Sequence, residues 1–276
     1  MPTPPPPKKG RPRLAAGRAR ALGLPTRGTT NPNRLRRMDN WLAARLGPLL
    51  RGASDPLVVD LGYGATPVTA VELVDRLARV RPDVRVLGLE IDPERVAAAQ
   101  PAADPPRLEF ARGGFELAGR RPAIVRAANV LRQYSESDAL AAWETMLANL
   151  APGGVLVEGT CDELGRLGGW VLLEAGGPQS LTLAARVETL ERPGELAERL
   201  PKALIHRNVR GERIYEFLRA FDAAWDAAAP VSSFGPRQRW VAAVERLVAE
   251  GWPVRADRAR HGEVTVAWSA VTPAIR

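Results

Sequence analysis

The sequence predicts an α/β fold with a doubly wound, mostly parallel sheet that carries helices on both faces. Short apolar runs alternate with segments of helical periodicity from Leu57 to about residue 159. The first run ends at Asp60 and continues into Gly62-Tyr63-Gly64, a pattern typical of a buried strand that turns tightly into a helix. Strands that alternate with helices form parallel sheets through right-handed crossovers. Ligands of such sheets bind at the carboxyl ends of the strands.

Each expected element of this core has its own signal. Asp92 and Pro93 predict the start of a short helix, as N-cap and first helical residue. The Pro152-Gly153-Gly154 segment predicts a break before the fifth strand. The expected strands are residues 57–61, 84–90, 107–111, 123–128 and 155–159, and the other helices are residues 68–80 and a segment from about 137.

The carboxyl-terminal part predicts additions to the same sheet. Residues 170–175 and 181–187 indicate a hairpin across Gly176-Gly177-Pro178, and residues 263–271 alternate as a late strand. Apolar residues at helical spacing predict helices around residues 214–225 and 240–248. We expect residues 31–276 to form a single domain, with a core at 55–160 and the additions at 161–276.

The net charge of +8 is concentrated at the amino terminus. Residues 1–37 hold ten Lys and Arg and no acid, which leaves 29 Lys and Arg against 31 Asp and Glu in the remainder. Residues 1–30 are rich in Pro, Gly and Arg and are predicted to be disordered. A flexible polycation at residues 8–37 suits RNA or another polyanion, and equally suits a solubilising tail.

A helix is expected directly after this segment. Asn31 is predicted to be its N-cap and Pro32 its first residue. One apolar stripe along it is expected to pack on the main domain, formed by Leu35, Met38, Leu42 and Leu46.

Composition excludes several classes of protein. A single cysteine rules out an internal disulfide framework, and two histidines are too few for a structural zinc site, so no metal is expected. No stretch approaches the length of a membrane span, and no apolar run follows the first basic residues. A cytoplasmic protein without membrane association is the expectation.

The turn after the first strand narrows the choice of ligand. A dinucleotide fingerprint needs a third glycine, and Pro67 occupies that place. There is no Gly-Lys-Ser/Thr phosphate loop either. Glu90 ends the second strand, where a carboxylate can accept both hydroxyls of a ribose, and Ile91 beside it can cover one face of a purine.

Three segments in this order resemble the class I S-adenosylmethionine-dependent methyltransferase family. Val59 to Gly64 resembles its first motif, Gly88 to Asp92 its second, and Leu150 to Glu158 the approach to its fifth strand. The resemblance spans about residues 55–160. It implies a Rossmann-like, seven-stranded sheet with a late antiparallel strand and S-adenosylmethionine as the cofactor. The implied cofactor residues are Asp60, Gly62 and Gly64 on the methionine side, Glu90 at the ribose, and Tyr63, Ile91, Gly113, Gly114, Phe115 and Asn129.

Two segments depart from the pattern of the family. Arg112 to Phe115 follows the third strand where many relatives carry an acid near the adenine, and Glu116 is a weaker substitute. After the fourth strand, Arg126 to Tyr134 lacks the Asn/Asp-Pro-Pro-aromatic box of enzymes that methylate base amines.

The catalytic residues are left open, with Asn129 and Cys161 as candidates. Asn129 can orient a substrate or satisfy backbone groups at a strand end. Thr160-Cys161 is similar to the nucleophile motif of RNA 5-methylcytosine methyltransferases, but the accompanying Asp-Ala-Pro-Cys box is missing. A lone cysteine is more often a small buried apolar residue.

Three functions therefore remain. The first is a methyltransferase that acts on RNA or another nucleic acid. The second is a small-molecule O- or N-methyltransferase whose acceptor pocket is built from the carboxyl-terminal tryptophans. The third is a methyltransferase-like binding protein without catalysis.

Overall fold

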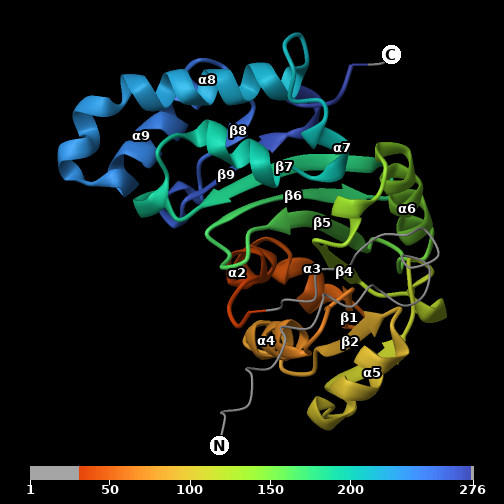
Figure 1. The fold of residues 1–276 in the computed structure, drawn as a ribbon. Helices are drawn as coiled ribbons and strands as arrows, with labels where there is room; N and C mark the ends of the chain where they lie inside the picture. The colour runs from red at the N-terminus through yellow and green to blue at the C-terminus, as the bar shows by residue number, and fades with distance from the viewer. Residues whose placement is uncertain (1–30, 275–276) are drawn as a thin grey trace, which may run out of the picture.

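The computed structural model describes residues 31–274, and a single nine-stranded sheet runs through them (Figure 1). Its order is β3-β2-β1-β4-β5-β6-β7-β9-β8. The strands are β1 (Leu57–Leu61), β2 (Arg85–Glu90), β3 (Leu108–Arg112), β4 (Ile124–Ala128), β5 (Val155–Cys161), β6 (Leu167–Glu174), β7 (Gly177–Ala185), β8 (Val254–Arg255) and β9 (Glu263–Ala267). Pairings from β3 to β5 are parallel and the later ones antiparallel, so β6 and β9 oppose the other seven strands.

The Rossmann-like, doubly wound α/β class is thus confirmed, while the sheet has nine strands where the family resemblance implied seven. The difference begins after β5, where the chain turns back at once. The Asp162 N–H donates to the Leu167 carbonyl at 3.0 Å and brings β6 alongside β5. The predicted hairpin and late strand then extend the sheet. Its last strand is β8, which the sequence analysis did not predict.

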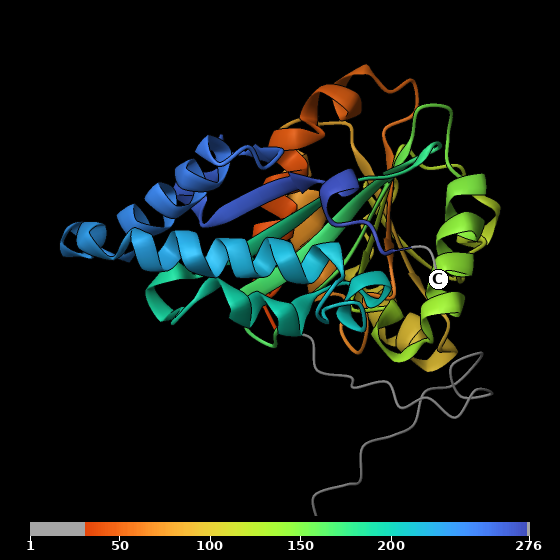
Figure 2. The same cartoon turned by 90° about the horizontal axis from the view of Figure 1, so that it is seen from above.

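Helices cover both faces of the sheet. On one face lie α2 (Arg36–Arg45), α3 (Gly47–Gly52), α4 (Val68–Leu77) and α5 (Pro93–Ala99). On the other lie α6 (Glu136–Ala148), α7 (Lys202–Ile205), α8 (Arg213–Ala227) and α9 (Pro236–Ala249). Figure 2 shows α2 and α8 on opposite sides of the strands. Within residues 31–274, every helix is too short or too polar to cross a bilayer.

The amino-terminal helix packs as predicted but begins later. Leu35, Met38, Leu42 and Leu46 are all buried. The predicted cap at Asn31 is wrong, because α2 starts at Arg36 after a turn. The Asn31 side chain instead donates to the Glu163 carbonyl at 2.9 Å, across to the segment after β5. Residues 1–30, predicted to be disordered, lie outside the described residues.

A buried charge cluster joins this helix to the sheet. Arg126 on β4 stands directly opposite Asp60 on β1 and donates to it at 3.0 Å and 2.6 Å. It also pairs with Asp39 of α2. Arg76 of α4 binds Asp39 from the other side at 2.6 Å. Arginine suits this place because its planar fork satisfies two carboxylates at once.

Candidate functional site

The sheet brings the predicted site residues to one edge. Because β1, β2, β4 and β5 run parallel, the turn after β1, Glu90 at the end of β2 and Asn129 after β4 all lie at the carboxyl edge. The strand order reverses between β1 and β4, which is where ligands of open α/β sheets bind.

The turn after β1 requires its two glycines. Gly62 has φ +69° and Gly64 has φ +89°, in the left-handed region that favours glycine. The Gly62 N–H donates to the Leu89 carbonyl at 2.7 Å, which ties the turn to β2. A Cβ on Gly62 would lie 2.8 Å from Cγ2 of Val130. The backbone of the turn therefore packs closely against the segment after β4.

Glu90, which the sequence analysis predicted to bind a ribose, reaches this turn. Its side chain is only 6% exposed. Oε2 accepts the Gly64 N–H at 3.2 Å and the Arg95 guanidinium at 3.5 Å. Oε1 accepts the Ile91 N–H at 2.8 Å. The carboxylate is thus held by backbone amides at the junction of the two predicted motifs.

The loop after β3 borders Glu90. The Gly113 N–H donates to the Glu90 carbonyl at 3.2 Å. Phe115 packs edge-on against Tyr134, with ring centroids 5.6 Å apart. Glu116 folds back to accept the Gly114 N–H at 2.7 Å. Its carboxylate therefore shapes its own loop.

Asp60 and Tyr63, at and next to the turn, have buried side chains. Asp60 is 1% exposed and its carboxylate is engaged by Arg126, so the side chain does not line the methionine side as expected. Tyr63 is buried edge-on against Phe110, at 5.2 Å between centroids. Burial, with Glu90 and Asp60 nearby, raises the pKa of the Tyr63 hydroxyl, which stays protonated.

The two catalytic candidates bind each other. The Asn129 side chain accepts the Cys161 N–H at 3.0 Å and donates to the Cys161 Sγ at 3.3 Å. Asn129 has φ +62°, and this bend points its amide at β5. Burial raises the pKa of the Cys161 thiol, so the thiolate that a nucleophile needs is disfavoured. This geometry favours a structural pair that closes the ends of β4 and β5.

The sequence analysis missed two buried ionisable side chains in the strands next to the site. Arg126 forms the cluster with Asp60, and Glu158 on β5 lies fully buried on the other face of the sheet. Burial raises the pKa of Glu158 to about 8, and the Trp143 indole opposes that shift. A charged residue inside an otherwise apolar strand was the available signal in both cases.

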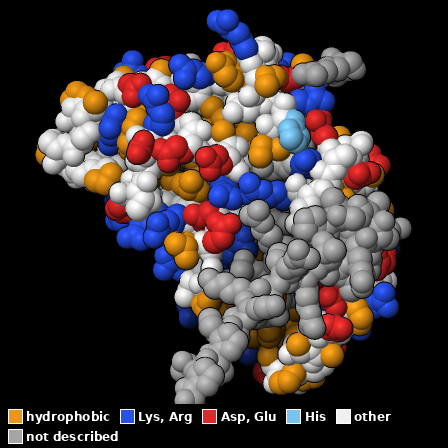
Figure 3. Space-filling view, in the orientation of Figure 1, with side chains coloured by type: hydrophobic (Ala, Val, Ile, Leu, Met, Phe, Trp, Pro, Cys, Tyr) orange, Lys and Arg blue, Asp and Glu red, His pale blue; other side chains and the backbone are white. Residues whose placement is uncertain are grey.

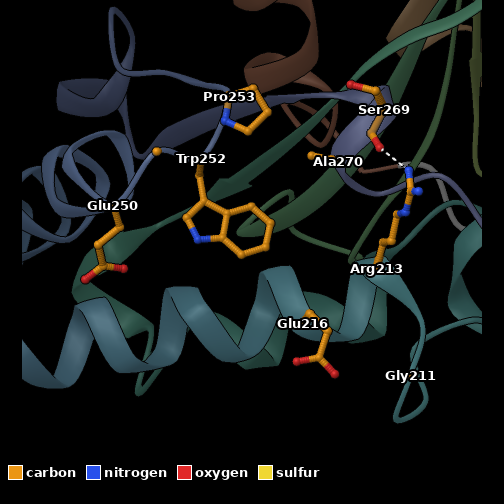
Figure 4. Close-up of a pocket in the computed structure, with 9 residues that line it drawn as sticks. Gly211, Arg213, Glu216, Glu250, Trp252, Pro253, Ser269 and Ala270 are labelled. Carbon is orange, nitrogen blue, oxygen red and sulfur yellow. Dashed lines mark hydrogen bonds between the residues drawn. The ribbon is translucent and has the colours of Figure 1, made fainter.

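Three of the carboxyl-terminal tryptophans lie in the core or at the far edge of the sheet. Trp225 and Trp240 are core residues. Trp252 lines an open hollow of about 540 Å³ at the opposite edge of the sheet, where β9 ends. Figure 4 shows its ring near α8, with Arg213 donating to the Ser269 carbonyl at 2.7 Å.

The chemistry at the turn is that of a ligand-binding edge. Backbone amides, one buried carboxylate and aromatic or aliphatic side chains converge there. Among residues 31–274, no group of three His, Cys, Asp or Glu is arranged to hold a metal ion.

Comparisons with known proteins come from solved structures. No family model and no curated protein matches the chain. Magnesium protoporphyrin IX methyltransferase from Synechocystis PCC 6803 is 21% identical, over 46% of this chain and 54% of that one, with a TM-score of 0.34. Human N-acetylserotonin methyltransferase is 22% identical, over 54% and 46%, with a TM-score of 0.31. The CcbJ methyltransferase from Streptomyces caelestis is 20% identical, over 55% and 65%, with a TM-score of 0.34.

The chain thus spans about half the length of the first two of these structures and 65% of the third. The scores are too low to say more of this chain than its own topology does. That topology runs β3-β2-β1-β4-β5 in parallel, with a glycine turn after β1 and an acid ending β2. By its fold, the chain is a Rossmann-like, doubly wound α/β protein.

Proposed function

We propose that the chain is an S-adenosylmethionine-dependent methyltransferase. The observation that carries this proposal is the contact between Gly64 and Glu90, which joins the glycine turn to the acid of β2 where the strand order reverses. A dinucleotide site would instead use a third glycine, and the chain has Pro67 there.

The residues present fit this cofactor. Gly62 and Gly64 have no side chains, so a ligand can approach the backbone of the turn closely. Glu90 is the acid for the ribose hydroxyls, and its present partners are amides and Arg95, which a pair of hydroxyls can replace or join. Ile91 and Phe115 supply apolar surface for the adenine.

Bound S-adenosylmethionine supplies an electrophilic methyl group on a sulfonium. The protein binds the cofactor, orients the acceptor and excludes water. Positioning of this kind accounts for a large share of the rate of methyl transfer. Asn129 fixes the ends of β4 and β5 through Cys161 and so sets the shape of the acceptor side.

RNA is the acceptor we propose. Support comes from the concentration of positive charge at residues 8–37, which favours a polyanion. The names of the similar structures lend no support to a nucleic-acid acceptor. Incubating the protein with methyl-labelled S-adenosylmethionine and cell extract, then separating RNA, protein and small molecules, tests the acceptor directly. Label in small molecules alone overturns the RNA acceptor, and no label in any fraction argues for binding without catalysis.

Glu90→Ala is expected to weaken cofactor binding. Loss of a charge-assisted pair to ribose costs about 1.5 to 3 kcal/mol, which is about 10- to 150-fold in Kd. Calorimetry with S-adenosylmethionine and S-adenosylhomocysteine measures it. Glu109→Ala is the matched control, because Glu109 is an exposed acid on the neighbouring strand β3. Failure of the wild type to bind, or equal binding by both variants, contradicts the proposal.

Gly62→Ala is expected to lower both stability and cofactor affinity. An alanine at this positive φ costs about 1 kcal/mol, and its Cβ would also collide with the Val130 side chain. Gly119→Ala separates the two effects, since Gly119 has the same φ of +69° and open space around its Cβ position. Urea unfolding should show the larger loss for Gly62→Ala, and calorimetry should show weaker binding for that variant alone. Equal behaviour of the two variants would mean that the approach to Val130 has no role.

A further inference from the structure

A second hollow, of about 400 Å³, opens beside α2, and five of the twelve residues that line it are arginines. Its walls come from α2, from the segment after β7, from the start of α9 and from the turn before β9. We call it the basic groove and define it by Arg36, Arg37, Arg237, Arg258 and Arg260. The exposed His261 also lines it.

The positive charge of the basic groove is only partly compensated. Glu263 pairs with Arg258 at 3.1 Å, and Glu188 lies 3.5 Å from Arg237. These are the two acids that line the groove, against five arginines.

Three arginines remain without an ion pair in the described part of the chain. Arg36 and Arg260 are exposed, and Arg37 donates only to the His261 carbonyl, at 3.0 Å. Burial lowers the pKa of Arg37, which means that its charge is poorly hydrated where it stands. An anion in the groove would restore the solvation that this guanidinium has lost.

The groove lies on the same edge of the sheet as the glycine turn. β7 runs in the direction of β5 and ends at Ala185, and β9 begins there at Glu263. Four strand spacings separate β1, which the glycine turn follows, from β7, and this is about 19 Å at about 4.8 Å each. A ligand that reaches from the groove to the turn is therefore extended, longer than a single phosphorylated metabolite.

Further positive charge precedes the groove in the chain. Seven Lys and Arg stand before Asn31, and Arg36 follows that residue by five positions. Figure 3, oriented as Figure 1, shows Lys and Arg side chains gathered on the left of the molecule, between the levels of α9 and α2. Phe234, 79% exposed, stands three residues before Arg237 and offers a ring on which a base can stack.

We infer that the basic groove binds backbone phosphates of a single-stranded RNA whose target base lies beside the cofactor bound at the glycine turn. This rests on the methyltransferase function proposed above. Guanidinium groups bind phosphate oxygens in pairs, and several of them along one edge match a repeating backbone charge. The groove holds the RNA strand and the turn holds the cofactor. A substitution in the groove can therefore weaken RNA binding without weakening cofactor binding.

The test is fluorescence anisotropy of the full chain with a labelled single-stranded 12-nucleotide RNA, titrated at several NaCl concentrations. Arg36→Gln/Arg260→Gln removes two unpaired charges of the groove. Arg120→Gln/Arg121→Gln is the matched control, because these two exposed arginines lie outside the groove, before β4, and make no ion pair among residues 31–274. We expect the groove variant to lose about tenfold in affinity at low salt. The slope of log affinity against log salt concentration should become shallower by about 1.4, because each of the two lost phosphate contacts contributes about 0.7.

The control variant should bind RNA within about twofold of the wild type. Calorimetry with S-adenosylmethionine should give the same affinity for all three proteins, so failure of the methyltransferase proposal appears in that measurement alone. Equal RNA binding by both variants overturns the inference. So does a wild-type protein that binds inorganic phosphate but not the RNA, because the groove would then be a site for single phosphates.

Discussion

Arg126→Met is expected to lower the free energy of unfolding by about 3 to 5 kcal/mol at pH 7, the cost of breaking a buried ion pair from one side. Arg126, Asp39 and Asp60 are all buried, and the guanidinium donates to both carboxylates and to the Thr69 carbonyl at 3.0 Å. Methionine fills the space of the side chain but leaves two buried carboxylates with less compensation. Urea unfolding measures the loss.

Two comparisons make this expectation specific. Arg85→Met removes an arginine from the exposed pair with Asp55, and such surface pairs contribute less than about 1 kcal/mol. Adding Asp39→Asn and Asp60→Asn to Arg126→Met removes the uncompensated charges and should recover much of the stability.

The pH dependence of the Arg126→Met variant follows from Asp39. Burial raises the pKa of Asp39, and Arg126 is the strongest influence that lowers it. Without Arg126 the folded carboxyl holds its proton more tightly than the unfolded one, so stability falls as pH rises through this window. The deficit should therefore be smaller at pH 5 than at pH 8. A deficit below about 1 kcal/mol at both pH values would show that the cluster is not a stabilising centre.

The elements around the glycine turn were predictable because local signals define them. The apolar runs of β1, β2, β4 and β5 and the cap at Asp92 lie within one or two residues of their expected places. The position of Glu90 at the end of β2 was predictable for the same reason, since a strand that ends in an acid near a glycine turn is visible in sequence.

What the sequence did not reveal depends on contacts between distant segments. Asp60 and Arg126 are 66 positions apart, and Asp39 and Arg126 are 87 apart, so no local pattern pairs them. The side chain of Asp60 was assigned to the ligand because its partner was unknown. The basic groove likewise joins α2 to the turn before β9, and only the sheet order brings them together.

Glu158→Gln is expected to remove a pH dependence of stability that the wild type carries. Burial raises the pKa of Glu158 from 4.5 to about 8. Between these values the folded state holds a proton that the unfolded state has released, so the free energy of unfolding falls as pH rises. Across the whole window this amounts to about 5 kcal/mol, and above about pH 8 the loss is complete.

Glutamine keeps the shape of Glu158 and has no proton to lose, so the variant and the wild type should be similar at pH 5. The variant should be the more stable at pH 8.5, and urea unfolding at steps between these values gives the difference curve. Other titrating groups cancel in this difference, because they are common to both proteins. Glu174→Gln, an exposed acid at the end of β6, should give a flat curve. A flat curve for Glu158→Gln, or a difference that shrinks as pH rises, would mean that the side chain is ionised in the folded protein, with a partner to stabilise its charge.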